Sequence, residues 1–239
     1  MDTLSTANRD PWRFRRFATL SCERFHVGNC KYGQGRFLKG EKTGSPWSLA
    51  EGTMSRFDRI STPIAGLIIV ERQRRGDDRG FFSRFFCREA LADFGGDGKI
   101  AQINHTLTQA AGTIRGLHFQ QAPHDEAKFV SCLSGAVFDV AVDLRPDSAT
   151  YLQWHGEVLS ADNGRSMMIP GGFAHGFQTL TEDCELIYLH DKPYAPEAEG
   201  GLNPLDPGLA IAWPLPVSQM SPRDQALPLL PNRIVAVRR

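Results

Sequence analysis

Short stretches in which apolar and polar residues alternate recur along the chain from about residue 54 onward. The most regular, residues 136–145, places Phe138, Val140, Val142 and Leu144 on one face and Val137, Asp139, Ala141 and Asp143 on the other. A period of two is that of a β-strand with two unlike faces, and here the second face is the more polar. Turn residues, for example those at 162–164, separate the stretches. The pattern predicts strands at 67–70, 136–145, 157–160, 166–169 and 185–190.

A helical pattern is confined to residues 88–94 and to short turns near the end of the chain. Many short strands joined by Gly/Pro turns favour a sandwich or a jelly-roll barrel. Two clusters rich in Gly and His, at 112–120 and 169–177, are joined by alternating segments, which is the layout of a cupin with its site inside the barrel. We therefore predict an all-β, cupin-like jelly-roll barrel with few short helices.

Residues 1–53 differ from the remainder of the chain. They are rich in Arg, Gly, Ser and Asn, and no helical or strand period lasts more than a few residues there. Such a segment cannot bury enough apolar surface to offset the entropy of ordering it. We expect residues 1–53 to be a disordered N-terminal extension, which a non-native upstream start would also explain, and residues 54–239 to form one domain.

Charge and cysteine content narrow the class of protein. Lys plus Arg and Asp plus Glu both number 27, so no global field favours nucleic acid or an anionic membrane as a partner. No apolar run is long enough to cross a bilayer, and the N-terminus lacks a signal-peptide pattern. The five cysteines share no disulfide or metal spacing, which indicates a reducing, cytoplasmic setting. Cys132 and Cys184 lie in apolar strand patterns and are expected in the core.

The first Gly/His cluster argues against a metal centre. Metal cupins carry His-x-His followed by a Glu, and three or four such ligands hold the ion. Here Gln120 stands two residues after His118, so the ligand pair is missing. A lone His beside cationic neighbours suits acid–base chemistry, and we predict neither a metal nor another cofactor. The alternatives are a metal-dependent cupin oxygenase or sugar isomerase, which metal analysis would identify, and a non-catalytic sugar-binding barrel.

From Met54 to about Leu230 the chain resembles the dTDP-4-dehydrorhamnose 3,5-epimerase family. The matching motifs occur in family order at 78–82, 102–105, 115–120, 137–145, 169–177, 194–200, 213–214 and 221–224. The resemblance implies an isomerase that inverts C3, C5 or both of a nucleotide-linked 4-keto-6-deoxyhexose, in deoxysugar or polysaccharide biosynthesis. A single-centre epimerase acting on another nucleotide sugar is the nearest alternative.

A ketone at C4 acidifies the hydrogens on C3 and C5. Inversion then needs a base on one face, an acid on the other, and a cation near the developing enolate. The resemblance implies that His118 is the base, that Asp224 fixes its tautomer, and that Tyr188 returns the proton. A register slip of one residue would decide whether Tyr188 points into the barrel. Lys128, with Arg115, would stabilise the C4 oxygen.

The family also implies contacts to the remainder of the substrate. Arginines would hold the two phosphates and an aromatic ring would stack on the base. We expect substrate contacts from Arg79, Phe82, Arg84, Gln102, Asn104, Arg115, Lys128, His175, Tyr194, Glu199 and Arg223. Asp139 stays open among three roles: orienting His118, orienting Lys128, or bonding to backbone. The remaining histidines are expected to be exposed or structural: His26, His105, His124, His155 and His190.

Two positions depart from the family pattern. Arg84 stands where the family has a Glu facing the thymine, and a cation cannot accept the same hydrogen bond from the base. Arg223 stands where the family has Lys. The nucleobase, and which of C3 and C5 is inverted, are therefore left open. The resemblance further implies a homodimer in which residues 79–84 of one subunit complete the neighbour's pocket.

Overall fold

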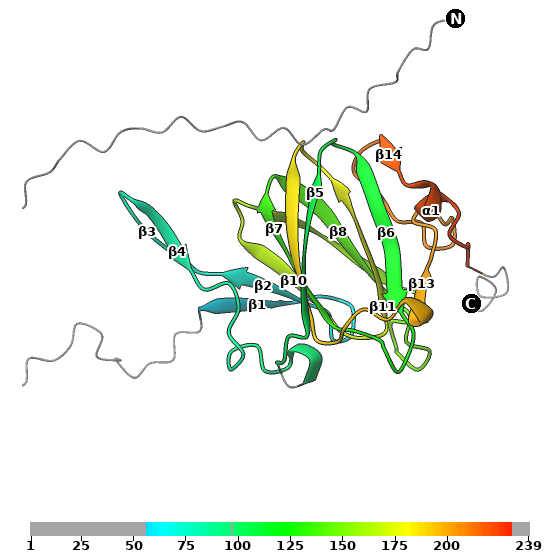
Figure 1. The fold of residues 1–239 in the computed structure, drawn as a ribbon, viewed down its shortest axis with the longest axis horizontal. Helices are drawn as coiled ribbons and strands as arrows, with labels where there is room; N and C mark the ends of the chain where they lie inside the picture. The colour runs from blue at the N-terminus through cyan, green and yellow to red at the C-terminus, as the bar shows by residue number, and fades with distance from the viewer. Residues whose placement is uncertain (1–55, 97, 231–239) are drawn as a thin grey trace, which may run out of the picture. The chain divides into compact units, whose positions relative to one another are not determined.

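Two sheets of antiparallel strands form the barrel in the computed structural model, which describes residues 56–96 and 98–230 (Figure 1). The expectation for residues 1–53 lies outside the described residues. The first sheet has the order β1 (Phe57–Ser61), β2 (Ile68–Arg72), β10 (Arg165–Ile169), β7 (Lys128–Ser134), β12 (Cys184–His190) and β5 (Gln102–Thr108).

The second sheet has the order β13 (Glu199–Gly201), β6 (Thr113–Gln120), β11 (Phe173–Thr179), β8 (Ala136–Asp143) and β9 (Trp154–Ser160), and β14 (Gln219–Met220) pairs with β6 in parallel. A separate hairpin of β3 (Arg74–Asp77) and β4 (Gly80–Ser83) extends away from both sheets (Figure 1). The all-β, cupin-like fold is confirmed, and every strand expected from the alternating pattern is present.

Helical structure is scarce in the described part of the chain, which has the 3-10 turns η1 (Phe94–Gly96) and η2 (Pro196–Ala198) and one short helix, α1 (Pro222–Gln225). The prediction of a helix at 88–94 is wrong, because the segment forms turns that end in η1. Gly95 has the left-handed φ of 59°, which ends any helical path. Leu91 and Phe94 are buried against Phe129, so packing under the sheet decides the local conformation.

Strand β8 shows why one of its faces was read as polar. The alternation is as expected: Val137 and Ala141 enter the core between the sheets, and Val140 packs in a second cluster on the opposite side. Asp139 and Asp143 are nevertheless fully buried. Buried carboxylates need partners. Asp143 has partners on both carboxylate oxygens and Asp139 is bonded through Oδ1, so this face is a core face with two polar positions built into it.

The core between the sheets is apolar. Cys132 and Cys184 belong to it, as predicted, together with Leu186 and Phe177. Tyr188 is the polar-tipped member of the same cluster. It lies where the apolar filling gives way to a cavity.

Candidate active site

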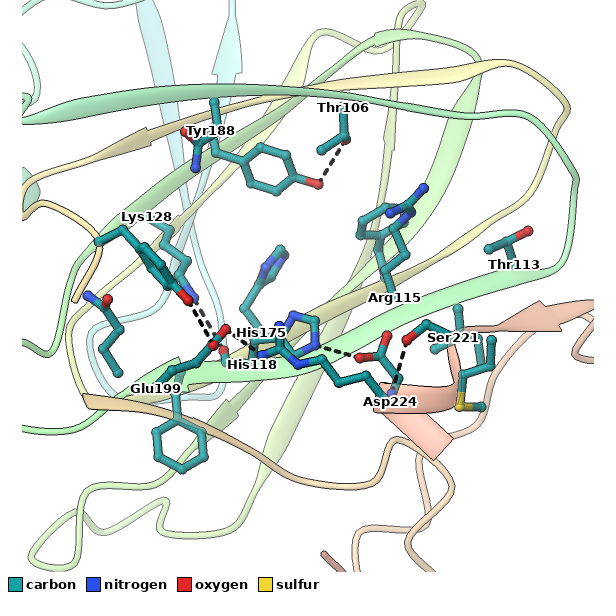
Figure 2. A pocket seen from close by; sticks show the side chains of 18 of the residues that line it. Thr106, Thr113, Arg115, His118, Lys128, His175, Tyr188, Glu199, Ser221 and Asp224 are labelled. Carbon is teal, nitrogen blue, oxygen red and sulfur yellow. Dashed lines mark hydrogen bonds and ion pairs between the residues drawn. The ribbon is translucent and has the colours of Figure 1, made fainter. Parts of the chain in front are cut away.

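A cavity of about 850 Å³ opens between the two sheets. Strands β5, β7 and β12 of the first sheet line it from one side, β6 and β11 of the second sheet from the other, and residues 218–225 close part of its rim. Figure 2 shows polar side chains pointing into this space from all of these walls. A concave site with a few convergent polar groups is the usual form of a small-molecule site.

His118 and Asp224 form a hydrogen-bonded pair at the second-sheet wall. His118 Nε2 lies 2.8 Å from Asp224 Oδ1, and the aspartate side chain is 5% exposed against 35% for the histidine. The second carboxylate oxygen accepts the Gly116 N–H at 3.2 Å. Because a carboxylate only accepts, Nε2 carries the proton and Nδ1 keeps its lone pair toward the cavity.

Local sequence fixes both partners of this pair. Ser221 caps α1 by accepting the Asp224 N–H on its hydroxyl at 3.0 Å, and Pro222 suits the first helical position. Gly116 has a φ of 127°, and a Cβ there would lie 2.6 Å from the Cα of Gly176 on β11. Only glycine lets β6 approach β11 this closely while presenting its N–H to the carboxylate.

Tyr188 enters the cavity from the first sheet. In β12 it pairs with Asn104 of β5, and its hydroxyl lies 3.3 Å from Thr106 Oγ1. The register therefore directs Tyr188 inward, which the sequence alone left undecided. Burial raises the pKa of its hydroxyl well above the ordinary value near 10, so the group stays protonated. Tyr188 and His118 thus face the cavity from opposite sheets (Figure 2).

His175 lies beside Tyr188, its ring edge-on at 6.1 Å between centroids. Its Nε2 is 2.7 Å from Asp139 Oδ1, and both side chains are buried. Asp139 therefore has none of the three roles left open for it: its partner is His175. The reason is the pairing of β8 with β11, which places Asp139 opposite Phe177, whereas His118 lies on β6, beyond β11, and Lys128 lies on β7 of the other sheet. Sequence spacing does not reveal a long-range pairing of this kind.

Lys128 is held at the start of β7. Its ammonium donates to the His118 carbonyl at 3.2 Å and forms an ion pair with Glu126 at 3.0 Å. His190 lies directly opposite it on β12, half-buried and on the wall of the cavity. The sequence did not single out His190 as a cavity residue. Its position two residues after Tyr188, on the same strand face, was the available signal.

The mouth of the cavity carries a linked set of polar residues. Tyr194 donates its hydroxyl to Glu199 at 2.9 Å, and Arg223 forms an ion pair with the same carboxylate at 2.5 Å. Arg115 lines the cavity and donates to Thr108 at 2.9 Å. The structure thus brings these predicted contact residues together around one opening.

Gln102 and Asn104 continue this wall along β5. Gln102 is bonded to Asn104 at 3.0 Å and accepts the Tyr194 N–H at 3.0 Å. Asn104 lines the cavity and lies 3.4 Å from His190 Nε2. Gln102 is therefore a support for cavity residues and does not itself line the space.

Three predicted contact residues lie elsewhere. Arg79 is in the turn of the β3–β4 hairpin and pairs with Asp77, and Phe82 on β4 is 62% exposed. Arg84, directly after β4, approaches the Cys87 sulfur. None of the three lines the cavity of this single chain.

The comparison with known families is decisive at this point. The family model described as dTDP-4-dehydrorhamnose 3,5-epimerase matches residues 61–232. The chain belongs to this family. It is accordingly a carbohydrate epimerase, an enzyme of the isomerase class.

Individual members of the dTDP-4-dehydrorhamnose 3,5-epimerase family agree. The enzyme of that name from Salmonella typhimurium is 39% identical over 178 residues, which are 74% of this chain and 97% of the relative. A dTDP-4-dehydrorhamnose 3-epimerase from Streptomyces niveus is also 39% identical, over 70% of this chain and 81% of its own length.

A solved structure has the same fold. The crystal structure of dTDP-6-deoxy-D-glucose-3,5-epimerase from Legionella pneumophila in complex with dTDP-4-keto-L-rhamnose is 43% identical, with a TM-score of 0.68 over 72% of this chain and 92% of that one.

Within residues 56–96 and 98–230, no group of three or more His, Cys, Asp or Glu side chains has the arrangement of a metal site. In the same residues, no helix combines the length and the apolar character needed to cross a bilayer.

Proposed function

We propose that this epimerase acts on a dTDP-linked 4-keto-6-deoxyhexose and inverts C3, C5 or both by removing and returning protons. One observation carries the proposal: a His–Asp pair and a protonated tyrosine face the same cavity from opposite sheets. Inversion by this route needs a proton acceptor and a proton donor on opposite faces of the sugar ring. The dTDP moiety is taken from the names of the relatives.

His118 begins the reaction. Its Nδ1 takes a proton from a carbon next to the C4 carbonyl, and Asp224 stabilises the resulting imidazolium through its hydrogen bond with the Nε2–H. The carboxylate is buried and also bonded to the Gly116 N–H, so the ring keeps one orientation throughout. This geometry supports His118 as the base and Asp224 as the residue that positions it.

The enolate is then stabilised and quenched from the other wall. The Lys128 ammonium, held between the His118 carbonyl and Glu126, lines the cavity beside the base and is suited to the C4 oxygen. The Tyr188 hydroxyl donates a proton to the opposite face of the carbanion. Because its pKa is raised, the hydroxyl stays protonated until the enolate, a strong base, takes the proton.

Binding of the diphosphate and the base completes the proposal. Arg115 and Arg223 are available at the cavity wall and mouth for two phosphates, and the 54% exposed ring of Tyr194 is available for stacking on the base. His175 contributes a further polar contact beside Tyr188.

We further propose a cytoplasmic homodimer in which the β3–β4 hairpin of one subunit reaches the pocket of its partner. The hairpin supports this because it extends away from both sheets of its own subunit (Figure 1) and exposes two aromatic residues, Phe81 at 61% and Phe82 at 62%. Exposed apolar surface of this kind usually contacts a partner. Arg79 and Arg84 lie on the same segment and would contact the nucleotide in the partner's pocket.

The test is incubation with dTDP-, UDP- and GDP-linked 4-keto-6-deoxyglucose in deuterated water, followed by NMR. Deuterium at C3, at C5 or at both reports which centre reacts, and the panel reports the base. His118→Ala is the control, because loss of a general base costs on the order of a hundred- to ten-thousandfold. Absence of exchange with every sugar, or unchanged exchange in a folded His118→Ala variant, would overturn the proposal.

A further inference from the structure

Lys128 is paired with Glu126, and the stability of the fold alone does not explain this ion pair. Glu126 and Lys128 form their ion pair with side chains that are only 7% and 9% exposed. Removing two charges from water costs about as much as their attraction returns, so buried pairs add little net stability. Glu126 Oε2 also has no hydrogen-bond partner among the described residues. An unsatisfied buried oxygen calls for an explanation, and a role at the cavity would supply one.

The Glu126–Lys128 pair lies on the wall of the cavity, next to His118. Glu126 and Lys128 both line the cavity. Lys128 is the first residue of β7, and Glu126 lies two residues before it. The ammonium also donates to the backbone carbonyl of His118, the residue whose side chain is the proposed base. Glu126 and the His118 carbonyl together hold the flexible lysine side chain at two points, and its third N–H remains available to a ligand.

The residue opposite Lys128 does not compete with it. His190 is its cross-strand neighbour on β12. Burial, and then the positive charge of Lys128, lower the pKa of His190 to about 4. His190 is therefore neutral near pH 7, and Lys128 is the charged group at this corner of the cavity, with Glu126 as its counter-ion.

We propose that Glu126 is a positioning residue for the epimerisation: through its ion pair it holds the Lys128 ammonium at the cavity wall where the C4 oxygen of the bound sugar lies. The inference rests on the proposed function, because it assumes that Lys128 stabilises the enolate. Glu126 touches Lys128 and acts through it.

The test compares Glu126→Gln, which keeps the shape and removes the charge, with Glu126→Asp, which keeps the charge. The expected result for Glu126→Gln is a fall in kcat for deuterium exchange of about tenfold to a hundredfold, the range for a displacement of about an ångström at a reacting centre. Affinity for dTDP alone stays unchanged, because dTDP lacks the sugar. Glu126→Asp recovers part of kcat. Glu185→Gln, which removes an exposed glutamate paired with His105, is the matched control and keeps wild-type kinetics.

Outcomes of this test separate the two proposals. If the wild-type enzyme catalyses deuterium exchange and Glu126→Gln exchanges as fast or faster, the role of Glu126 alone is overturned. If the wild-type enzyme catalyses no exchange, the proposed function is overturned. A second measurement does not depend on turnover: crystal structures of the wild type and Glu126→Gln should show the Lys128 ammonium leaving the His118 carbonyl in the variant. An ammonium that stays in place would also refute the inference.

Discussion

Replacing Asp224 by asparagine should disable the base without removing it. Asp224 accepts two N–H groups, from His118 at 2.8 Å and from Gly116 at 3.2 Å. Asparagine offers one acceptor oxygen and one NH₂ group. If its oxygen stays on the Gly116 N–H, its NH₂ faces His118 Nε2, and the ring must then carry its proton on Nδ1. That nitrogen would have no lone pair for the substrate.

The size of the effect follows from this tautomer. Loss of general-base catalysis costs on the order of 10²–10⁴ in rate, which corresponds to about 3–5 kcal/mol of transition-state stabilisation. The change in folding free energy should be smaller, about 1–2 kcal/mol, because asparagine fills the same space and keeps one of the two bonds. kcat and stability should therefore separate clearly.

The assay is deuterium exchange from solvent into the sugar, followed by NMR, with thermal unfolding measured in parallel. Asp206→Asn is the matched control: Asp206 is also buried and accepts backbone N–H groups of Gly208 and Leu209, but it lies outside the cavity. It should lose stability and keep kcat. Wild-type kcat in Asp224→Asn, or a loss fully accounted for by unfolding, would refute the argument.

Three further predictions concern the acid, metals and the N-terminus. Tyr188→Phe should retain exchange at the first carbon while net inversion falls sharply, since the base is untouched; a fall of both to the His118→Ala level would reassign Tyr188. Activity should survive dialysis against a strong chelator, and a stoichiometric transition metal needed for activity would favour the oxygenase alternative. A chain beginning at Met54 should keep the stability, dimer and activity of the full chain; loss of soluble dimer would place the domain boundary elsewhere.

Local patterns were sufficient for five of the strands, β2, β8, β9, β10 and β12, whereas strands such as β5 and β7 were not predicted. Alternation over 136–145 identified β8, because this signal lies within one strand, and the two Gly/His clusters overlap β6 and β11. The partner of Asp139 could not be found this way. It depends on which strands become neighbours, and β8 pairs with β11 across more than thirty residues of sequence.

Glu126 and His190 escaped notice for a related reason. Glu126 precedes β7 and has the composition of an ordinary surface turn, yet it is buried beside Lys128. His190 ends β12 in a segment whose inward face could be assigned only once the register with β5 and β7 was known. A sheet register shifted by one residue would have turned both Tyr188 and His190 to the outside.

The position of α1 along the chain has a consequence for synthesis on the ribosome. His118 and Asp224 are 106 residues apart, and strands β1 to β13 all end before residue 202. The ribosome therefore synthesises the strands β1 to β13 before it adds Asp224, the partner of His118. A nonsense codon between residues 202 and 220 would leave those thirteen strands in the polypeptide and remove the carboxylate. The proposed proton transfer thus becomes possible only as translation nears its end.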